Sequence, residues 1–201
     1  MDRKSSSYWV CRKRATELLL RQTNLETDFN ILFMDHGDRT IIIDSIQNYC
    51  RLLHINRGRM RVNGKMVSGF QIYDKQKDIY SIFYNSSGYN LGHLRWIIAH
   101  EMGHIYMGHG DVYSDSDEIE ANAFARSLLM PEYSVRRIIR DYGIKSAEDI
   151  ARIFNVSETA ARYRLNNLGQ VFSVSEADQA IWYMQSMTIK DKIDRLSRKI
   201  I

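Results

Sequence analysis

One stretch of the sequence, from about Leu91 to Met107, has the length of a helix and carries apolar residues on every side. A helix of this kind lies in the interior of a fold. The same stretch contains the polar residues His100, Glu101 and His104. Polar groups removed from water need partners that offset their lost hydration, and a bound metal ion is one such partner. The core is therefore expected to surround a helix that carries metal-binding side chains.

His100, Glu101 and His104 form the pattern H-E-x-x-H. Residues four apart on a helix lie about 40° apart around its axis, so both imidazoles can reach one ion. Imidazole nitrogens suit Zn²⁺, which lowers the pKa of a bound water to about 7 at an open coordination position. Glu101 can then take the proton of that water. The sequence predicts a zinc site with both histidines as ligands and Glu101 as the general base.

A third ligand is expected from the next helix, residues 117–130, which contains several acids. Its apolar residues define one stripe at helical spacing: Ala121, Phe124, Ala125, Leu128 and Leu129. Glu118 falls within this stripe, whereas Glu120 lies about 140° from its centre. Asp117 and Glu120 are therefore expected to be solvated acids near a helix N-terminus. Glu118 is favoured as the third ligand, with Glu120 as the alternative acid.

His109 is another candidate for the third ligand. Metzincin peptidases follow the pattern H-E-x-x-H-x-x-G-x-x-H, with glycine three and histidine six residues after the second histidine of H-E-x-x-H. This chain has Met107 and Gly110 at those two positions. His109 is expected instead to line the cleft or to be structural. Asn122, four residues after Glu118, is expected to orient a metal-bound histidine. The donor that stabilises the reacting oxygen stays open among Tyr106, His109 and Tyr113.

The chain before the predicted metal-binding helix, residues 91–107 (the metal helix), combines two predicted helices with several β-prone runs. Residues 7–25 predict a helix, and residues 44–53 predict a second one between strands. Short β-prone runs occur at residues 31–34, 41–43, 69–73 and 78–84, with turn signals such as Asn63-Gly64 between them. These runs predict a small antiparallel sheet.

The bulk properties favour a chain of the cytoplasm with no membrane contact. Hydrophobic residues make up 44% of the sequence, which is enough for a packed core. The basic N-terminus lacks the apolar run of a signal peptide, and no uncharged apolar stretch of about eighteen residues occurs. Two cysteines, Cys11 and Cys50, are too few for a disulfide framework and fit a reducing compartment.

Pro131, the only proline, marks the start of a helical region. Ser146 and Ser157 are expected to cap two short helices joined by a short turn, which is typical of a helix-turn-helix. Polar residues are expected to project from the second of these helices: Arg162, Arg164, Asn166 and Asn167. DNA contact through them is possible in chemical terms, but substrate docking or packing is favoured. Residues 175–201 predict an amphipathic helix that packs onto the domain.

Residues 95–104, 108–109 and 118–131 resemble the ImmA/IrrE family of metallopeptidases. The segment beginning at Glu118, with the pattern E-x-x-A-N-x-F-A-x-x-L-L-M-P, is the more specific part. The likeness extends over about residues 90–170 and implies Glu118 as the third ligand. Family members often carry R-F-T before the motif, where this chain has Trp96 and Ile97. That departure is expected to change packing more than chemistry.

The expected fold is therefore α+β in three parts. Residues 1–130 are predicted to form a zincin-like metallopeptidase domain with an N-terminal helix, a small antiparallel sheet, the metal helix and the third-ligand helix. Residues 131–170 are predicted to form a helix-turn-helix-like region. Residues 171–201 are predicted to form the C-terminal amphipathic helix.

The resemblance also implies a function. Several family members are encoded by phages, mobile elements or bacterial chromosomes and cleave helix-turn-helix repressors, so that silenced genes are expressed. The expected function is a Zn²⁺-dependent endopeptidase that cleaves such a repressor and derepresses phage, mobile-element or stress genes. The alternative is a non-proteolytic regulator that binds DNA or a protein partner and keeps a vestigial peptidase motif.

Overall fold

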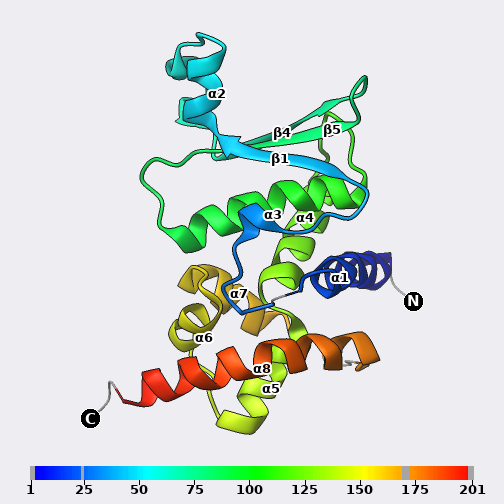
Figure 1. Cartoon of the computed structure of the whole chain (residues 1–201), viewed down its shortest axis with the longest axis vertical. Coiled ribbons are helices and arrows are strands. Elements are labelled where there is room, and N and C mark those ends of the chain that lie inside the picture. Colours follow the sequence, from blue (N-terminus) through cyan, green and yellow to red (C-terminus); the bar gives the residue numbers. More distant parts are fainter. Residues whose placement is uncertain (1–2, 24, 169–172, 199–201) are drawn as a thin grey trace.

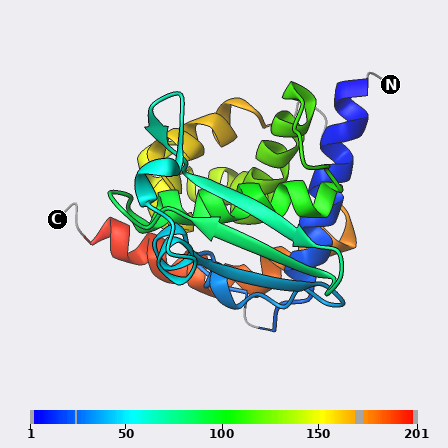
Figure 2. The ribbon, with the colours of Figure 1, turned by 90° about the horizontal axis from the view of Figure 1, so that it is seen from above.

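The computed structural model describes residues 3–23, 25–168 and 173–198, in which a small sheet lies over the metal helix and further helices lie beneath it (Figures 1 and 2). The strands are β1 (Thr40–Ser45), β2 (Arg61–Val62), β3 (Lys65–Met66), β4 (Gly69–Asp74) and β5 (Ile79–Tyr84). The helices are α1 (Arg3–Leu20), α2 (Ile46–Leu52), α3 (Leu91–Met107), α4 (Asp115–Leu129), α5 (Glu132–Tyr142), α6 (Ala147–Phe154), α7 (Glu158–Asn166) and α8 (Glu176–Ser197), with 3-10 turns η1 (Ile31–Phe33) and η2 (Arg57–Arg59). The predicted α+β class is confirmed.

The main sheet has three strands in the order β1-β5-β4. β4 and β5 pair antiparallel as predicted, but β1 pairs parallel to β5, so the prediction of a purely antiparallel sheet is wrong. The chain leaves β1 at Ser45 and enters β4 at Gly69 at the same end of the sheet, after α2, η2 and the hairpin of β2 and β3, so β4 runs opposite to β1. The turn into β5 reverses the direction once more, and β5 lies between the two strands and parallel to β1. The hairpin turns at Asn63 and Gly64, which both have positive φ, as the turn signal predicted.

Residues 31–34 do not form the predicted strand. The side-chain oxygen of Asn30 accepts a hydrogen bond from the backbone N–H of Leu32, which turns the chain into η1. Ile31 is buried beneath this turn. Met34 is buried as well, whereas Leu32 and Phe33 are exposed, so the apolar run reflects two buried anchors three residues apart rather than a strand.

Helix α3 is the buried centre of the fold, as its sequence predicted. Asn90 caps its first turn, and Gly108, with a φ of 78°, ends it in the left-handed conformation that glycine adopts without strain. β4 and β5 contact one side of α3, and α4 contacts another, while α1 packs against α4. The core that results includes Ile98, Met102 and Phe124.

The helices after Pro131 form a layer under α4 (Figure 1). Ser146 and Ser157 cap α6 and α7 as predicted, and a short turn joins these two helices. α8 crosses the layer and contacts α1, α5 and α6, so the predicted packing of the tail is confirmed for the described part of this helix. The buried positions of α8 are Asp178, Ile181, Gln185, Ile189 and Ile193, whereas Met187 is exposed. Positions 169–172 and 199–201 lie outside the described residues.

Arg164 contradicts the expectation that it projects from the second helix of this unit. Its side chain is fully buried and donates a hydrogen bond to the hydroxyl of Tyr8 in α1, 2.9 Å away. It also lies 3.8 Å from the buried carboxylate of Glu132. Since the partners of Arg164 come from α1 and α5, the residue connects α7 to the rest of the molecule.

Across the described residues, no helix combines the length and apolar character needed to cross a membrane.

Candidate metal centre

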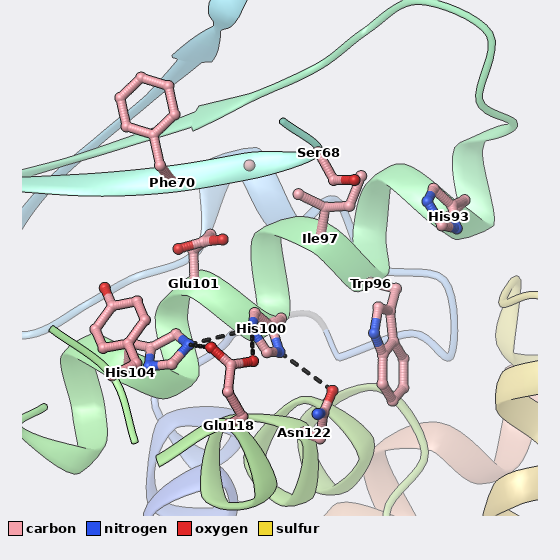
Figure 3. A pocket seen from close by; sticks show the side chains of 12 residues that line it. Ser68, Phe70, His93, Trp96, Ile97, His100, Glu101, His104, Glu118 and Asn122 are labelled. Atoms are coloured by element: carbon pink, nitrogen blue, oxygen red, sulfur yellow. Dashed lines mark hydrogen bonds and ion pairs between the residues drawn. The ribbon is translucent and has the colours of Figure 1, made fainter. Parts of the chain in front are cut away.

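Helices α3 and α4 bring His100, His104 and Glu118 together (Figure 3). The Nε2 atoms of the two histidines are 3.1 Å apart. The carboxylate oxygens of Glu118 lie 3.4 Å from Nε2 of His100 and 3.6 Å from Nε2 of His104. One ligand atom from each of the three side chains falls within 4.8 Å of the others. The residues predicted as ligands thus form one group that could hold a metal ion.

The protonation states of the histidines suit metal binding. Burial, together with the neighbouring imidazoles of His100 and His109, lowers the pKa of His104 to about 3. Burial also lowers the pKa of His100. Both rings are therefore neutral near pH 7 and have a lone pair to donate. Two imidazole nitrogens and one carboxylate are a donor set that fits zinc and leaves room for water.

Glu101 lies between α3 and the sheet, beside the group of possible ligands (Figure 3). Its side chain is buried, and its Oε2 atom has no hydrogen-bond partner within the described part of the chain. Burial, together with the negative charge of Glu118, raises the pKa of Glu101 to about 7. A carboxyl with a pKa near neutrality can both accept and return a proton.

Two further residues, Asn122 and His109, contact the possible histidine ligands. Oδ1 of Asn122 is 3.2 Å from Nδ1 of His100, as expected for a residue that orients this imidazole. His109 instead contacts Nδ1 of His104, on the ring edge opposite the nitrogen that faces Glu118. His109 therefore lies outside the group of possible ligands and contacts one of them, His104.

Glu120 is not the solvated acid that the helical stripe predicted. Its side chain is 24% exposed, less than the 46% of Glu118, and it accepts a hydrogen bond from the hydroxyl of Ser7. Helix α1 covers this side of α4, a tertiary contact that the sequence of α4 alone does not contain. Asp117 does cap the helix N-terminus, in a capping box with Ser114, and also lies 3.5 Å from His109.

The possible ligands open into a cavity of about 470 Å³. β4 forms one wall and α3 another, and the lining includes Ser68, Gly69, Phe70, His93, Trp96 and Ile97. The sequence reasoning did not assign this wall. A signal was present, because a glycine within a strand often marks the close approach of another group. A Cβ atom on Gly69 would lie 2.5 Å from Cγ2 of Ile97 and 3.2 Å from Oε1 of Glu101.

The structure distinguishes the three candidates for a donor to the reacting oxygen. Tyr113 lines the cavity, and its ring stacks on His104 with centroids 3.7 Å apart. Its hydroxyl accepts a hydrogen bond from Gln71 of β4, 3.0 Å away. The Tyr106 hydroxyl contacts His36 instead, and His109 is engaged by His104. Tyr113 is therefore the candidate whose hydroxyl is near the cavity.

Two histidines and a glutamate that gather beside a buried carboxyl are a donor set of the kind found in metallopeptidases. The model of the peptidase M78 family, described as the IrrE N-terminal-like domain, matches residues 50–166, and the chain belongs to this family. The chain is also similar to the metallopeptidase ImmA of Bacillus subtilis (strain 168), with 30% identity over 112 residues. That alignment covers 51% of this chain and 64% of the relative, less than two thirds of its length. No solved structure matches the chain significantly.

Proposed function

We propose that this protein is a zinc-dependent endopeptidase. The observation that carries the proposal is the gathering of two neutral imidazoles and the Glu118 carboxylate beside the buried carboxyl of Glu101. His100, His104 and Glu118 would hold the ion. Zinc bound there would polarise the carbonyl of the peptide bond and make a water molecule more acidic.

Glu101 would carry the proton in this reaction. Its carboxylate would accept a proton from the attacking water and return it to the amine that leaves. Without an ion, burial and the charge of Glu118 raise the pKa of Glu101 to about 7. A zinc ion nearby would favour the carboxylate form, which is the form that accepts the proton. The hydroxyl of Tyr113 would donate a hydrogen bond to the carbonyl oxygen as negative charge develops there.

The wall formed by β4 suits a peptide substrate. β4 pairs with β5 along one side and is one of the two edge strands of the described three-stranded sheet. An extended peptide can add to such an edge through backbone hydrogen bonds. Because Gly69 and Phe70 of β4 line the cavity, a peptide at this edge would pass over Glu101 and the possible ligands. The substrate we propose is a helix-turn-helix transcriptional repressor, by analogy with the family that the sequence resembles.

DNA binding by the protein itself is not favoured. Arg164 is buried, and Arg162 is engaged by the carboxylate of Glu158 one turn earlier on α7. The α6 and α7 unit is therefore proposed to pack or to dock the substrate. A protein that binds the repressor and leaves it intact would support the alternative of a non-proteolytic regulator.

Glu101→Gln provides the test of this function. The purified protein is incubated with the repressor encoded beside its gene, with a chelator, and with a chelator followed by excess zinc. Wild type is expected to give fragments, the chelator to stop cleavage, and zinc to restore it. Glu101→Gln is expected to bind zinc and remain folded, yet to cleave at least about 100-fold more slowly. The matched control is Glu148→Gln on the surface of α6, which should cleave like wild type. Cleavage by Glu101→Gln at the wild-type rate would contradict the role of Glu101.

A further inference from the structure

His109 follows α3 directly and is folded back onto it. Gly108 ends the helix with a φ of 78°, and the backbone N–H of His109 then donates to the carbonyl of His104, 3.0 Å away. Only 5% of the His109 side chain is exposed. The end of α3 thus places a buried imidazole beside the more buried of the two possible histidine ligands.

The contacts of His104 determine which of its nitrogens carries the proton. Its Nε2 atom faces Nε2 of His100 and the carboxylate of Glu118, so this is the nitrogen available to an ion. A neutral imidazole that ligates through one nitrogen has its proton on the other. Nδ1 of His104 is therefore the donor, and it lies 2.9 Å from Nδ1 of His109.

His109 must then accept at Nδ1 and carry its own proton at Nε2. That Nε2 atom lies 3.3 Å from Oε2 of Glu120 and 3.5 Å from Oδ1 of Asp117, which are both acceptors. The other oxygen of Glu120 accepts a hydrogen bond from Ser7. With an ion on Nε2 of His104, each hydrogen bond in this series has one direction, and together they connect His104 to the N-terminal helix α1.

A ligating histidine commonly donates to a carboxylate, a backbone carbonyl or a water molecule. His100 follows a similar pattern, with the amide oxygen of Asn122 as its acceptor. His104 differs because an imidazole stands between it and the carboxylate. We propose that His109 is a positioning residue that fixes the tautomer and ring orientation of His104 and transmits the charge of Glu120 to it. This inference rests on the metal site proposed above.

Two substitutions separate the acceptor role of His109 from its bulk. His109→Phe keeps a ring but removes the acceptor, whereas His109→Asn keeps an acceptor oxygen close to the position of Nδ1. Zinc affinity is measured by competition with a chromogenic chelator, and folding is monitored by circular dichroism. His109→Phe is expected to bind zinc about 10 to 100-fold more weakly, and His109→Asn to recover most of that loss.

The matched control is His54→Asn. His54 is exposed and has a φ of 52°, which asparagine tolerates, so its zinc affinity should equal that of wild type. Wild-type affinity in His109→Phe would overturn the positioning role. Absence of zinc binding by the wild-type protein would overturn the proposed metal site instead.

The tautomers can also be observed without any substitution. Long-range ¹H–¹⁵N correlation spectra of the zinc-loaded protein with ¹⁵N-labelled histidine, at about pH 8 where imidazoles of ordinary pKa are neutral, report which nitrogen carries each proton. The expected result is a proton on Nδ1 of His104 and on Nε2 of His109. A proton on Nδ1 of His109 would refute the proposal, even if His109→Phe failed to fold.

Discussion

At the scale of single residues, the side chain that is missing from Gly69 shapes the site. β4 approaches α3 so closely there that a methyl group would meet Ile97 and the carboxyl of Glu101. The phenyl ring of Phe70 lies on the other face of the sheet, against Tyr49 and Phe83. Gly69 therefore leaves the space in which Glu101 and a substrate carbonyl could meet.

Gly69→Ala is expected to reduce activity and stability together. Crowding in a packed region typically costs about 1–3 kcal/mol, and displacement of Glu101 would slow cleavage further. Cleavage rate and the midpoint of thermal unfolding are the measurements. Gly110→Ala is the control, because a Cβ atom there would meet nothing within 4 Å. Equal behaviour of the two variants would mean that β4 can shift away from α3.

The residue scale also shows what sequence could and could not predict about the site. His100, Glu101 and His104 were predictable because their spacing on one helix is a local property. Glu118 followed from the apolar stripe of α4. The prediction that Glu120 is solvated was wrong because the helix that covers it, α1, lies more than a hundred residues earlier in the chain.

At the scale of elements, local signals predicted most helix boundaries. The predicted ends of α3 match the structure because its capping residue and its terminal glycine are both local. The direction of β1 relative to its neighbour could not be predicted, since it depends on whether β1 pairs with β4 or with β5, a contact between distant segments. Helix α7 likewise has a local pattern that fits several functions. Contacts with α1 and α5 remove Arg164 from its exposed face, whereas Arg162 and Asn166 stay exposed.

Arg164→Leu is expected to destabilise the protein by about 1–3 kcal/mol, because Tyr8 and the buried carboxylate of Glu132 would lose a partner while Arg136 stays paired with Glu132. The comparison is Arg162→Leu, an exposed pair on the same helix, for which about 0–1 kcal/mol is expected. Denaturant unfolding of both variants measures the difference. Similar losses for the two variants would show that Arg164 is not the buried link between α7 and α5.

The effect of Arg164→Leu is also expected to depend on pH. Burial alone would raise the pKa of Glu132, but the charge of Arg164 and hydrogen bonds from Tyr8 and Arg136 outweigh it and lower the pKa below the ordinary 4.5. The stabilisation from this carboxylate is therefore complete above pH 4.5 and is lost as pH falls through the lowered pKa. The difference in stability between wild type and Arg164→Leu should shrink below that pH. A constant difference in denaturant unfolding across this range would contradict the assignment.

At the scale of the whole molecule, many contacts cross the proposed domain boundaries. Arg12 of α1 pairs with Asp178 of α8 at 2.5 Å, and Lys192 of α8 pairs with Asp28 at 3.0 Å. A Cβ atom on Gly92 of α3 would lie 2.9 Å from the backbone of Val156, in the turn between α6 and α7. The division into residues 1–130, 131–170 and 171–201 stays a prediction about sequence regions, and these contacts favour one folding unit.

The protein is therefore expected to unfold in a single cooperative transition. In scanning calorimetry, the calorimetric and van't Hoff enthalpies should agree. Gly92→Ala should lower the transition temperature without splitting the peak, because the contact it disturbs joins α3 to the helical layer. Gly110→Ala again serves as the control. Two separate transitions in wild type would show that the helical region after Pro131 folds independently.

The three side chains of the proposed site meet solvent unequally. The exposed fraction is 1% for His104, 18% for His100 and 46% for Glu118. Both histidines are fixed within α3, whereas Glu118 extends from the first turn of α4. A competing chelator would therefore approach a bound ion from the side of Glu118. The rate at which an ion is exchanged should follow the detachment of this one arm, while the paired imidazoles determine how tightly the ion is finally held.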